Sequence, residues 1–172
     1  MGRALADRGY SLVYGGGATG LMGRVSVAAL QSGAKVIGVI PEIFNTEARA
    51  QRGLSELHVV KDMHARKALM AELSEAFIAL PGGIGTFEEL FEILTWAQIG
   101  LHSRPIGLLD VNGYFDPCIA LLDQARDEGF TYVEHRDLIM CDSDPNILLD
   151  LLQEYRPPPG LQQWHKREET KK

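Results

Sequence analysis

The chain has 172 residues, of which 45% are hydrophobic and 23% charged, a balance typical of one globular domain with a well-buried core. Its net charge is −6, with +3 on residues 156–172 and therefore −9 on residues 1–155, and so acidic a folded part disfavours nucleic acid as a partner. No apolar run approaches the roughly 20 residues that span a bilayer, and no signal-peptide pattern opens the chain, so we expect a cytoplasmic protein with no membrane partner.

Short apolar runs and helix-periodic segments alternate along the chain. The first eight residues have the pattern of a helix that ends at Gly9. The runs predict buried strands at residues 12–14, 36–40, 57–60, 77–80, 106–109 and 138–140. Helical periodicity marks residues 24–31, 63–73, 87–98, 115–127 and 145–155. This alternation predicts an α/β fold with a doubly wound, mostly parallel, Rossmann-like sheet.

A doubly wound sheet ordinarily opens on a strand, whereas this chain opens on a helix. We therefore expect the first strand of the fold to be missing from the chain. In a sheet ordered 3-2-1-4-5-6 that strand is central, and its absence would leave two strand edges unpaired. Since no linker interrupts residues 1–155, they are predicted to form a single nucleotide-binding domain. Residues 156–172, which carry three prolines at positions 157–159, are predicted to be a mobile tail.

The first glycine-rich segment, residues 15–20, follows a predicted strand and opens a helix, so it matches the pattern G-x-G-x-x-G in its expected context. A dinucleotide site would also need an acidic residue after the next strand, and Glu42 fits that place imperfectly. A mononucleotide site fits equally well, with Gly16 and Gly17 close to the ribose or base. The pattern leaves both interpretations open.

A second constellation begins the helix that precedes the strand at residues 77–80. Asp62 is in the position of an N-cap, and Met63 has the character of a core residue. Arg66 and Lys67 are adjacent and therefore point about 100° apart on the helix. Without other information, a solvated basic pair is the simplest interpretation of these two residues.

The most informative segment is the glycine loop at residues 80–89, between an apolar run and an amphipathic helix. Gly82, Gly83 and Gly85 permit close approach of an anion to the backbone, and the helix start offers N–H groups and a positive dipole end. We interpret this loop as a phosphate cradle. The structural alternative is a capping box, in which Thr86 caps the helix and Glu89 reaches back to it.

Cysteine and histidine content gives no sign of a metal centre. Cys118 and Cys141 are too few for a disulfide framework and lack C-x-x-C spacing, which favours a reducing compartment and a structural role. The five histidines show no spacing typical of a zinc site. We therefore expect no bound metal.

Taken together, these segments and the helix around Thr95 resemble the LOG family, the cytokinin riboside 5′-monophosphate phosphoribohydrolases, from Leu5 to about Leu152. The resemblance implies hydrolysis of the N-glycosidic bond of AMP or N6-prenyl AMP to a free base and ribose 5-phosphate, without a cofactor, by a homodimer. It places the catalytic residues at Arg66 and Glu89. It places phosphate-binding residues at Gly82, Gly83, Gly85 and Thr86, and further substrate contacts at Met63, Lys67, Glu88 and Thr95.

The implied roles agree with the chemistry of the reaction. Cleavage of a ribosyl bond develops positive charge on the sugar and negative charge on the leaving base. A carboxylate at Glu89 suits oxocarbenium stabilisation or water activation, and a guanidinium at Arg66 suits support of the leaving group and orientation of Glu89. Two alternatives stay open at this point, a nucleotide- or molybdenum-cofactor-binding carrier without turnover and a nicotinamide-dependent oxidoreductase.

Overall fold

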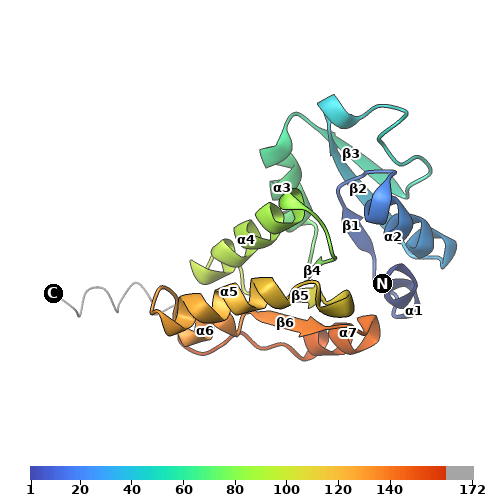
Figure 1. Cartoon of the computed structure of the whole chain (residues 1–172). Helices are drawn as coiled ribbons and strands as arrows, with labels where there is room; N and C mark the ends of the chain where they lie inside the picture. Colours follow the sequence, from blue (N-terminus) through green and yellow to red (C-terminus); the bar gives the residue numbers. More distant parts are fainter. Residues whose placement is uncertain (162–172) are drawn as a thin grey trace. The chain divides into compact units, whose positions relative to one another are not determined.

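The structure is a computed structural model that describes residues 1–161 (Figure 1). These residues belong to two compact units, one from Met1 to Ser74 and one that begins at Glu75. Each unit contains a three-stranded parallel sheet with helices packed against it, which confirms the predicted α/β class. Most of the predicted tail, residues 162–172, lies outside the described residues, and the expectation of a single domain stays a prediction.

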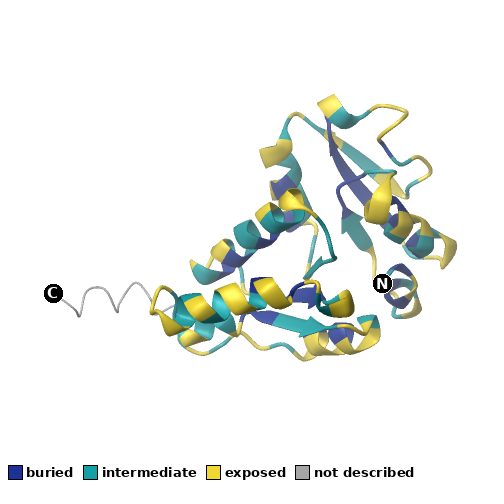
Figure 2. Ribbon diagram, viewed as in Figure 1, coloured by how far each residue is buried: buried dark blue, intermediate teal, exposed yellow. Residues whose placement is uncertain are grey.

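The first unit contains a sheet of order β1-β2-β3, in which both strand pairs are parallel. Its elements are α1 (Gly2–Asp7), β1 (Leu12–Tyr14), α2 (Gly20–Gln31), β2 (Val36–Pro41), the short 3-10 helix η1 (Glu42–Phe44), β3 (Glu56–Val60) and α3 (Met63–Glu72). The central strand β2 is buried along its whole length, as Figure 2 shows. A continuous apolar run is expected for such a strand, because neighbours and helices cover it on all sides.

The second unit contains a parallel sheet of order β4-β5-β6, again with the fully buried strand at its centre. Its elements are β4 (Phe77–Ala79), α4 (Ile84–Gln98), β5 (Ile106–Leu109), the 3-10 helix η2 (Val111–Gly113), α5 (Asp116–Asp127), α6 (Val133–Arg136), β6 (Ile139–Asp142) and α7 (Pro145–Glu154). The core of this unit joins α4 and β5 to the residues around Phe115, which is fully buried.

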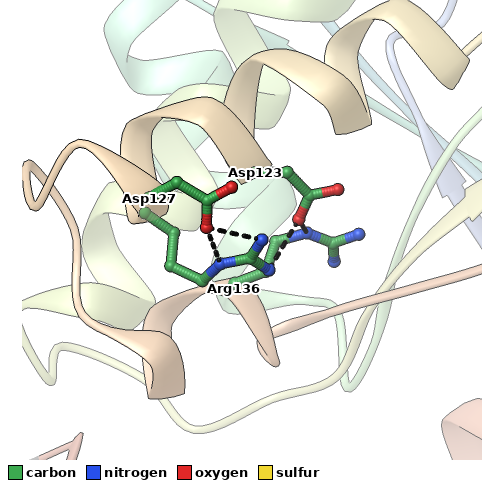
Figure 3. A network of polar contacts seen from close by, with 4 residues as sticks. Asp123, Asp127 and Arg136 are labelled. Carbon is green, nitrogen blue, oxygen red and sulfur yellow. Dashed lines mark hydrogen bonds and ion pairs between the residues drawn. The ribbon is translucent and has the colours of Figure 1, made fainter.

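Two features of the second unit differ from the sequence-based expectation. Helix α4 begins at Ile84, three residues earlier than predicted, so the glycines of the loop belong partly to the helix. The short helix α6 was not predicted. It is tied to α5 by Arg136, whose Nε donates to Oδ1 of Asp123 at 2.8 Å, in the network shown in Figure 3. Asp123 also accepts from Arg126 at 2.9 Å.

Within residues 1–161, no helix combines the length and the apolar character that crossing a bilayer requires. Over the same range, no group of three or more His, Cys, Asp and Glu side chains is arranged to hold a metal ion. Cys118 is buried and Cys141 is partly buried, and neither forms a disulfide. Burial raises the pKa of both thiols, as expected for structural cysteines.

Candidate active site

The first glycine loop, residues 15–20, connects β1 to α2 and is fastened to the segment before β3. The backbone N–H of Gln51 donates to the carbonyl of Gly16 at 2.8 Å, and that of Ala18 donates to the carbonyl of Arg49 at 2.8 Å. Gly16 has a φ of +71°, a conformation that glycine adopts without strain. The loop is therefore held to residues 49–51 by two backbone hydrogen bonds, one accepted by Gly16 and one donated by Ala18.

Arg66 extends from α3 to this loop, within the same unit. Asp62 caps α3 by accepting from the backbone N–H of Ala65 at 2.8 Å, as predicted. The guanidinium group of Arg66 then lies against Gly15, where an added Cβ would come within 2.7 Å of Cζ. Its Nη1 also approaches the sulfur of Met63 at 3.7 Å. The sequence interpretation of a solvated basic pair is therefore wrong for Arg66, which packs on the glycine loop.

The residues on either side of Arg66 also differ from the simplest expectation. Met63 is 37% exposed, so it is not a core residue, and it is accessible to a ligand. Lys67 is only 9% exposed, so it is not part of a solvated face. The exposure of Met63 leaves room for a substrate contact, and the contacts that the resemblance implies for Met63 and Lys67 stay predictions.

The second glycine loop lies between β4 and α4, in the second unit. Gly83 is the N-cap of α4, and as a glycine it offers no side chain of its own to cap the helix. The first backbone N–H groups of a helix have no partner within the helix. The side chain of Thr86 fills the space beside Gly82, where an added Cβ would lie 2.9 Å from Cβ of Thr86. The helix therefore starts from a glycine N-cap next to a hydroxyl, an arrangement that suits an anion.

The capping-box alternative is contradicted by the start of α4. Because the N-cap is Gly83 and not Thr86, Glu89 lies in the second turn of the helix and has no capping position to fill. Glu89 is half-buried, whereas Glu88 is exposed. A role for Glu89 beyond capping therefore accounts better for this carboxylate.

Thr95 lies two turns further along α4 and lines a small cavity inside the second unit. Its hydroxyl donates to the carbonyl of Phe91 at 2.7 Å. The cavity has a volume of about 200 Å³, and its walls include Leu94, Leu122 and the buried His135. An open groove of about 480 Å³ lies in the first unit along α2, and neither Gly16 nor Gly17 lines it.

One contact to the second loop was not anticipated from the sequence. The hydroxyl of Tyr114, which follows β5, donates to the carbonyl of Gly82. The residues are 32 positions apart, and no local pattern signals such a contact. The candidate site therefore consists of two parts. In the first unit Arg66 packs on the first glycine loop, and in the second unit Glu89 lies on α4, close to the second glycine loop. Their pairing stays a prediction, because they belong to different units.

Comparison with known proteins identifies close relatives. The family model described as "Possible lysine decarboxylase" matches residues 22–152. The chain is 54% identical over 143 residues to a cytokinin riboside 5′-monophosphate phosphoribohydrolase of Rhodococcoides fascians, a match that covers 82% of this chain and 72% of that protein. It is 47% identical over 157 residues to a protein of Oryza sativa subsp. japonica named as a probable enzyme of the same activity. That match covers 91% of this chain but only 64% of the rice protein, less than two thirds of its length.

Among solved structures, the chain is similar to the molybdenum cofactor binding protein of the phototrophic bacterium Rippkaea orientalis. The TM-score is 0.65 and the sequence identity 21%, with 88% of this chain and 81% of that chain covered. At this identity the likeness establishes the shared fold only.

Proposed function

The chain belongs to the family of the cytokinin riboside 5′-monophosphate phosphoribohydrolases, and we propose that it hydrolyses the N-glycosidic bond of a nucleoside 5′-monophosphate to a free base and ribose 5-phosphate. The observation that carries this proposal is the 54% identity to the enzyme of Rhodococcoides fascians. The substrate is AMP or N6-prenyl AMP, and the reaction uses no cofactor.

The 5′-phosphate binds at the start of α4. Gly82, Gly83 and Gly85 allow the anion to approach the backbone, and the helix dipole and the hydroxyl of Thr86 stabilise it. The open space around Gly83 and Gly85, where an added Cβ would meet no atom within 4 Å, supports this assignment. Fixing the phosphate positions the ribosyl bond for cleavage, so that remote binding energy contributes to the rate.

Glu89 and Arg66 act on opposite ends of the breaking bond. The carboxylate of Glu89 stabilises the oxocarbenium character of the sugar or activates the attacking water. Water supplies the hydroxyl group of ribose 5-phosphate, and its remaining proton goes to the nitrogen of the released base. Arg66 stabilises the charge on the departing base. Met63, Lys67, Glu88 and Thr95 contact the substrate, with Gly16 and Gly17 close to its ribose or base.

Incubation with AMP and with N6-prenyl AMP, followed by chromatography of the products, tests the proposal. We expect a free base to accumulate in proportion to enzyme and time, and the Glu89→Gln variant to serve as the inactive control. A carrier of nucleotide or molybdenum cofactor would bind its ligand without releasing a base. Binding of both nucleotides with no base released would therefore reject the enzyme in favour of a carrier.

The same proposal includes a homodimer in the cytoplasm. The support for the dimer is the family resemblance, together with exposed apolar side chains in the second unit, such as Phe130 at 83% and Val133 at 63%. Two cysteines without a disulfide support a reducing compartment. Light scattering on the purified protein tests the dimer, and a mass of 19.0 kDa would contradict it.

A further inference from the structure

Tyr114 connects the segment after β5 to the second glycine loop. Its hydroxyl donates a hydrogen bond to the carbonyl oxygen of Gly82, and the residue as a whole is 42% exposed. More than half of its surface is therefore covered, and the hydrogen bond and the ring contacts determine where the side chain lies. The partner of that bond is a peptide group of the proposed phosphate site.

The ring of Tyr114 is held in place by aromatic neighbours. It stacks on the ring of Phe87 at a centroid distance of 6.4 Å and an interplanar angle of 14°. It also meets the ring of Phe115 edge-on at 5.3 Å. Phe115 is fully buried, and its backbone N–H donates to Oδ1 of Asp110 at 2.7 Å. The ring of Tyr114 therefore packs on a residue that is fixed in the core of the second unit.

The turn before Tyr114 has an unusual backbone. Asn112 has a φ of +57° and Gly113 a φ of +69°, so two successive residues adopt the left-handed conformation. For Asn112 this conformation is uncommon and carries a cost in free energy. The turn therefore presents Tyr114 at a defined place at the expense of local strain, which a flexible connection would avoid.

The hydrogen bond to Gly82 has a direct consequence for the next residue. A trans peptide is planar, and its carbonyl and N–H groups point in opposite directions. Holding the Gly82 carbonyl toward Tyr114 thus directs the N–H of Gly83 to the other side. Gly83 is the N-cap of α4, and an added Cβ there would meet no atom within 4 Å. Two neighbouring glycines would otherwise let this peptide rotate.

We propose that Tyr114 is a positioning residue for the phosphate site, which keeps the N–H of Gly83 directed at the bound anion through the Gly82 carbonyl. The proposal rests on the proposed function only in its assignment of the anion as a substrate phosphate. It predicts that loss of the hydroxyl weakens recognition of the phosphate group and leaves recognition of the rest of the substrate unchanged.

The Tyr114→Phe variant tests this, because it removes the hydroxyl and keeps the ring stacked on Phe87. We expect the Kd for ribose 5-phosphate, measured by calorimetry, to rise about 3–10-fold, the usual effect of one lost hydrogen bond. The ratio of kcat/KM for AMP to kcat/KM for adenosine should fall by the same factor. Tyr10→Phe is the matched control, since Tyr10 is exposed to a similar degree, at 38%, and belongs to the other unit.

The two proposals can fail separately. An unchanged Kd for ribose 5-phosphate in Tyr114→Phe, or equal losses on AMP and adenosine, would overturn the positioning role and leave Tyr114 as a structural tether. If the wild-type protein released no base at all, the proposed function would fail. The calorimetric comparison would then still decide the role of Tyr114, because it measures binding of the phosphate and not turnover.

Discussion

The guanidinium group of Arg66 occupies the space beside Gly15 in which any other residue would place its Cβ. Helix α3 and the first glycine loop therefore pack directly against each other, and both belong to the first unit. Gly15 is not in the left-handed conformation, so the backbone itself does not require glycine there. Glycine is needed at this position because a larger residue would clash with the side chain of Arg66, the proposed catalytic arginine.

This relationship predicts the effect of Gly15→Ala. The added methyl group displaces the flexible end of Arg66 and leaves the backbone conformation allowed. We expect kcat to fall about 10²–10³-fold, the usual loss of one electrostatic partner in a transition state. The melting temperature should fall by less than about 4 °C, which corresponds to about 1 kcal/mol in a chain of this size.

A double-mutant cycle with Arg66→Ala tests whether Gly15 acts through Arg66. If it does, the double variant is no less active than Arg66→Ala alone, because the methyl group then displaces nothing that matters. Additive losses would show that Gly15 acts independently of Arg66, for example by approaching the substrate itself.

The variant Glu89→Gln is expected to lose base release with little change in stability. Because the N-cap of α4 is Gly83, Glu89 lies beyond the capping-box position, and replacement by glutamine should not weaken a cap. We predict a fall in kcat of about 10²–10³-fold with the melting temperature unchanged. Turnover assays and thermal melts on the same preparation check this, and normal turnover per folded molecule would remove Glu89 from the mechanism.

The variant Gly85→Ala is expected to be more stable than the wild-type protein and to bind AMP more weakly. Gly85 lies in the first turn of α4, and the space beside it is open. Alanine should therefore stabilise the helix by up to about 1 kcal/mol. We expect weaker binding of AMP in the same variant, because the methyl group covers the approach to the backbone. A more stable variant with unchanged affinity for AMP would place the phosphate elsewhere.

The cysteines are predicted to be inert in the folded protein. Burial raises the pKa of the Cys118 thiol, and burial together with Asp110 and two further carboxylates raises that of Cys141. Since the folded pKa is the higher one, the contribution to stability is present at neutral pH and is lost as the pH rises through the folded pKa. Alkylation at about pH 8, near the ordinary pKa of a thiol, should be slow and leave activity intact. Rapid inactivation by a thiol reagent would contradict this.

The bounds of the buried strands could be predicted from the sequence more accurately than the start of helix α4. Strands β1 and β5 were predicted at their observed bounds, because short continuous apolar runs between turn residues are typical of buried strands. The start of α4 was placed too late, since the glycines at its beginning favour loops by propensity. Because the observed N-cap is Gly83, Thr86 lies inside the first turn and not in the capping position that the sequence suggested.

The residues of the candidate site could be predicted from the sequence, but the contacts that these residues make could not. The family pattern identified Arg66 and Glu89, yet the packing of Arg66 on Gly15 joins segments about 50 positions apart, and only the fold brings them together. Tyr114 was missed for the same reason. A tyrosine in a turn carries no periodicity, and its contact with Gly82 depends on the pairing of β4 with β5.

The central claim is that this chain cleaves the ribosyl bond of a nucleotide that it holds by its phosphate. The most direct test is to measure kcat/KM for AMP and for adenosine on the same preparation, with mass-spectrometric detection of ribose 5-phosphate. We predict that AMP yields adenine and ribose 5-phosphate in equal amounts, and that adenosine reacts at least about 100-fold less efficiently because it lacks the phosphate. Comparable efficiency on adenosine and AMP, or no cleavage of either, would contradict this account.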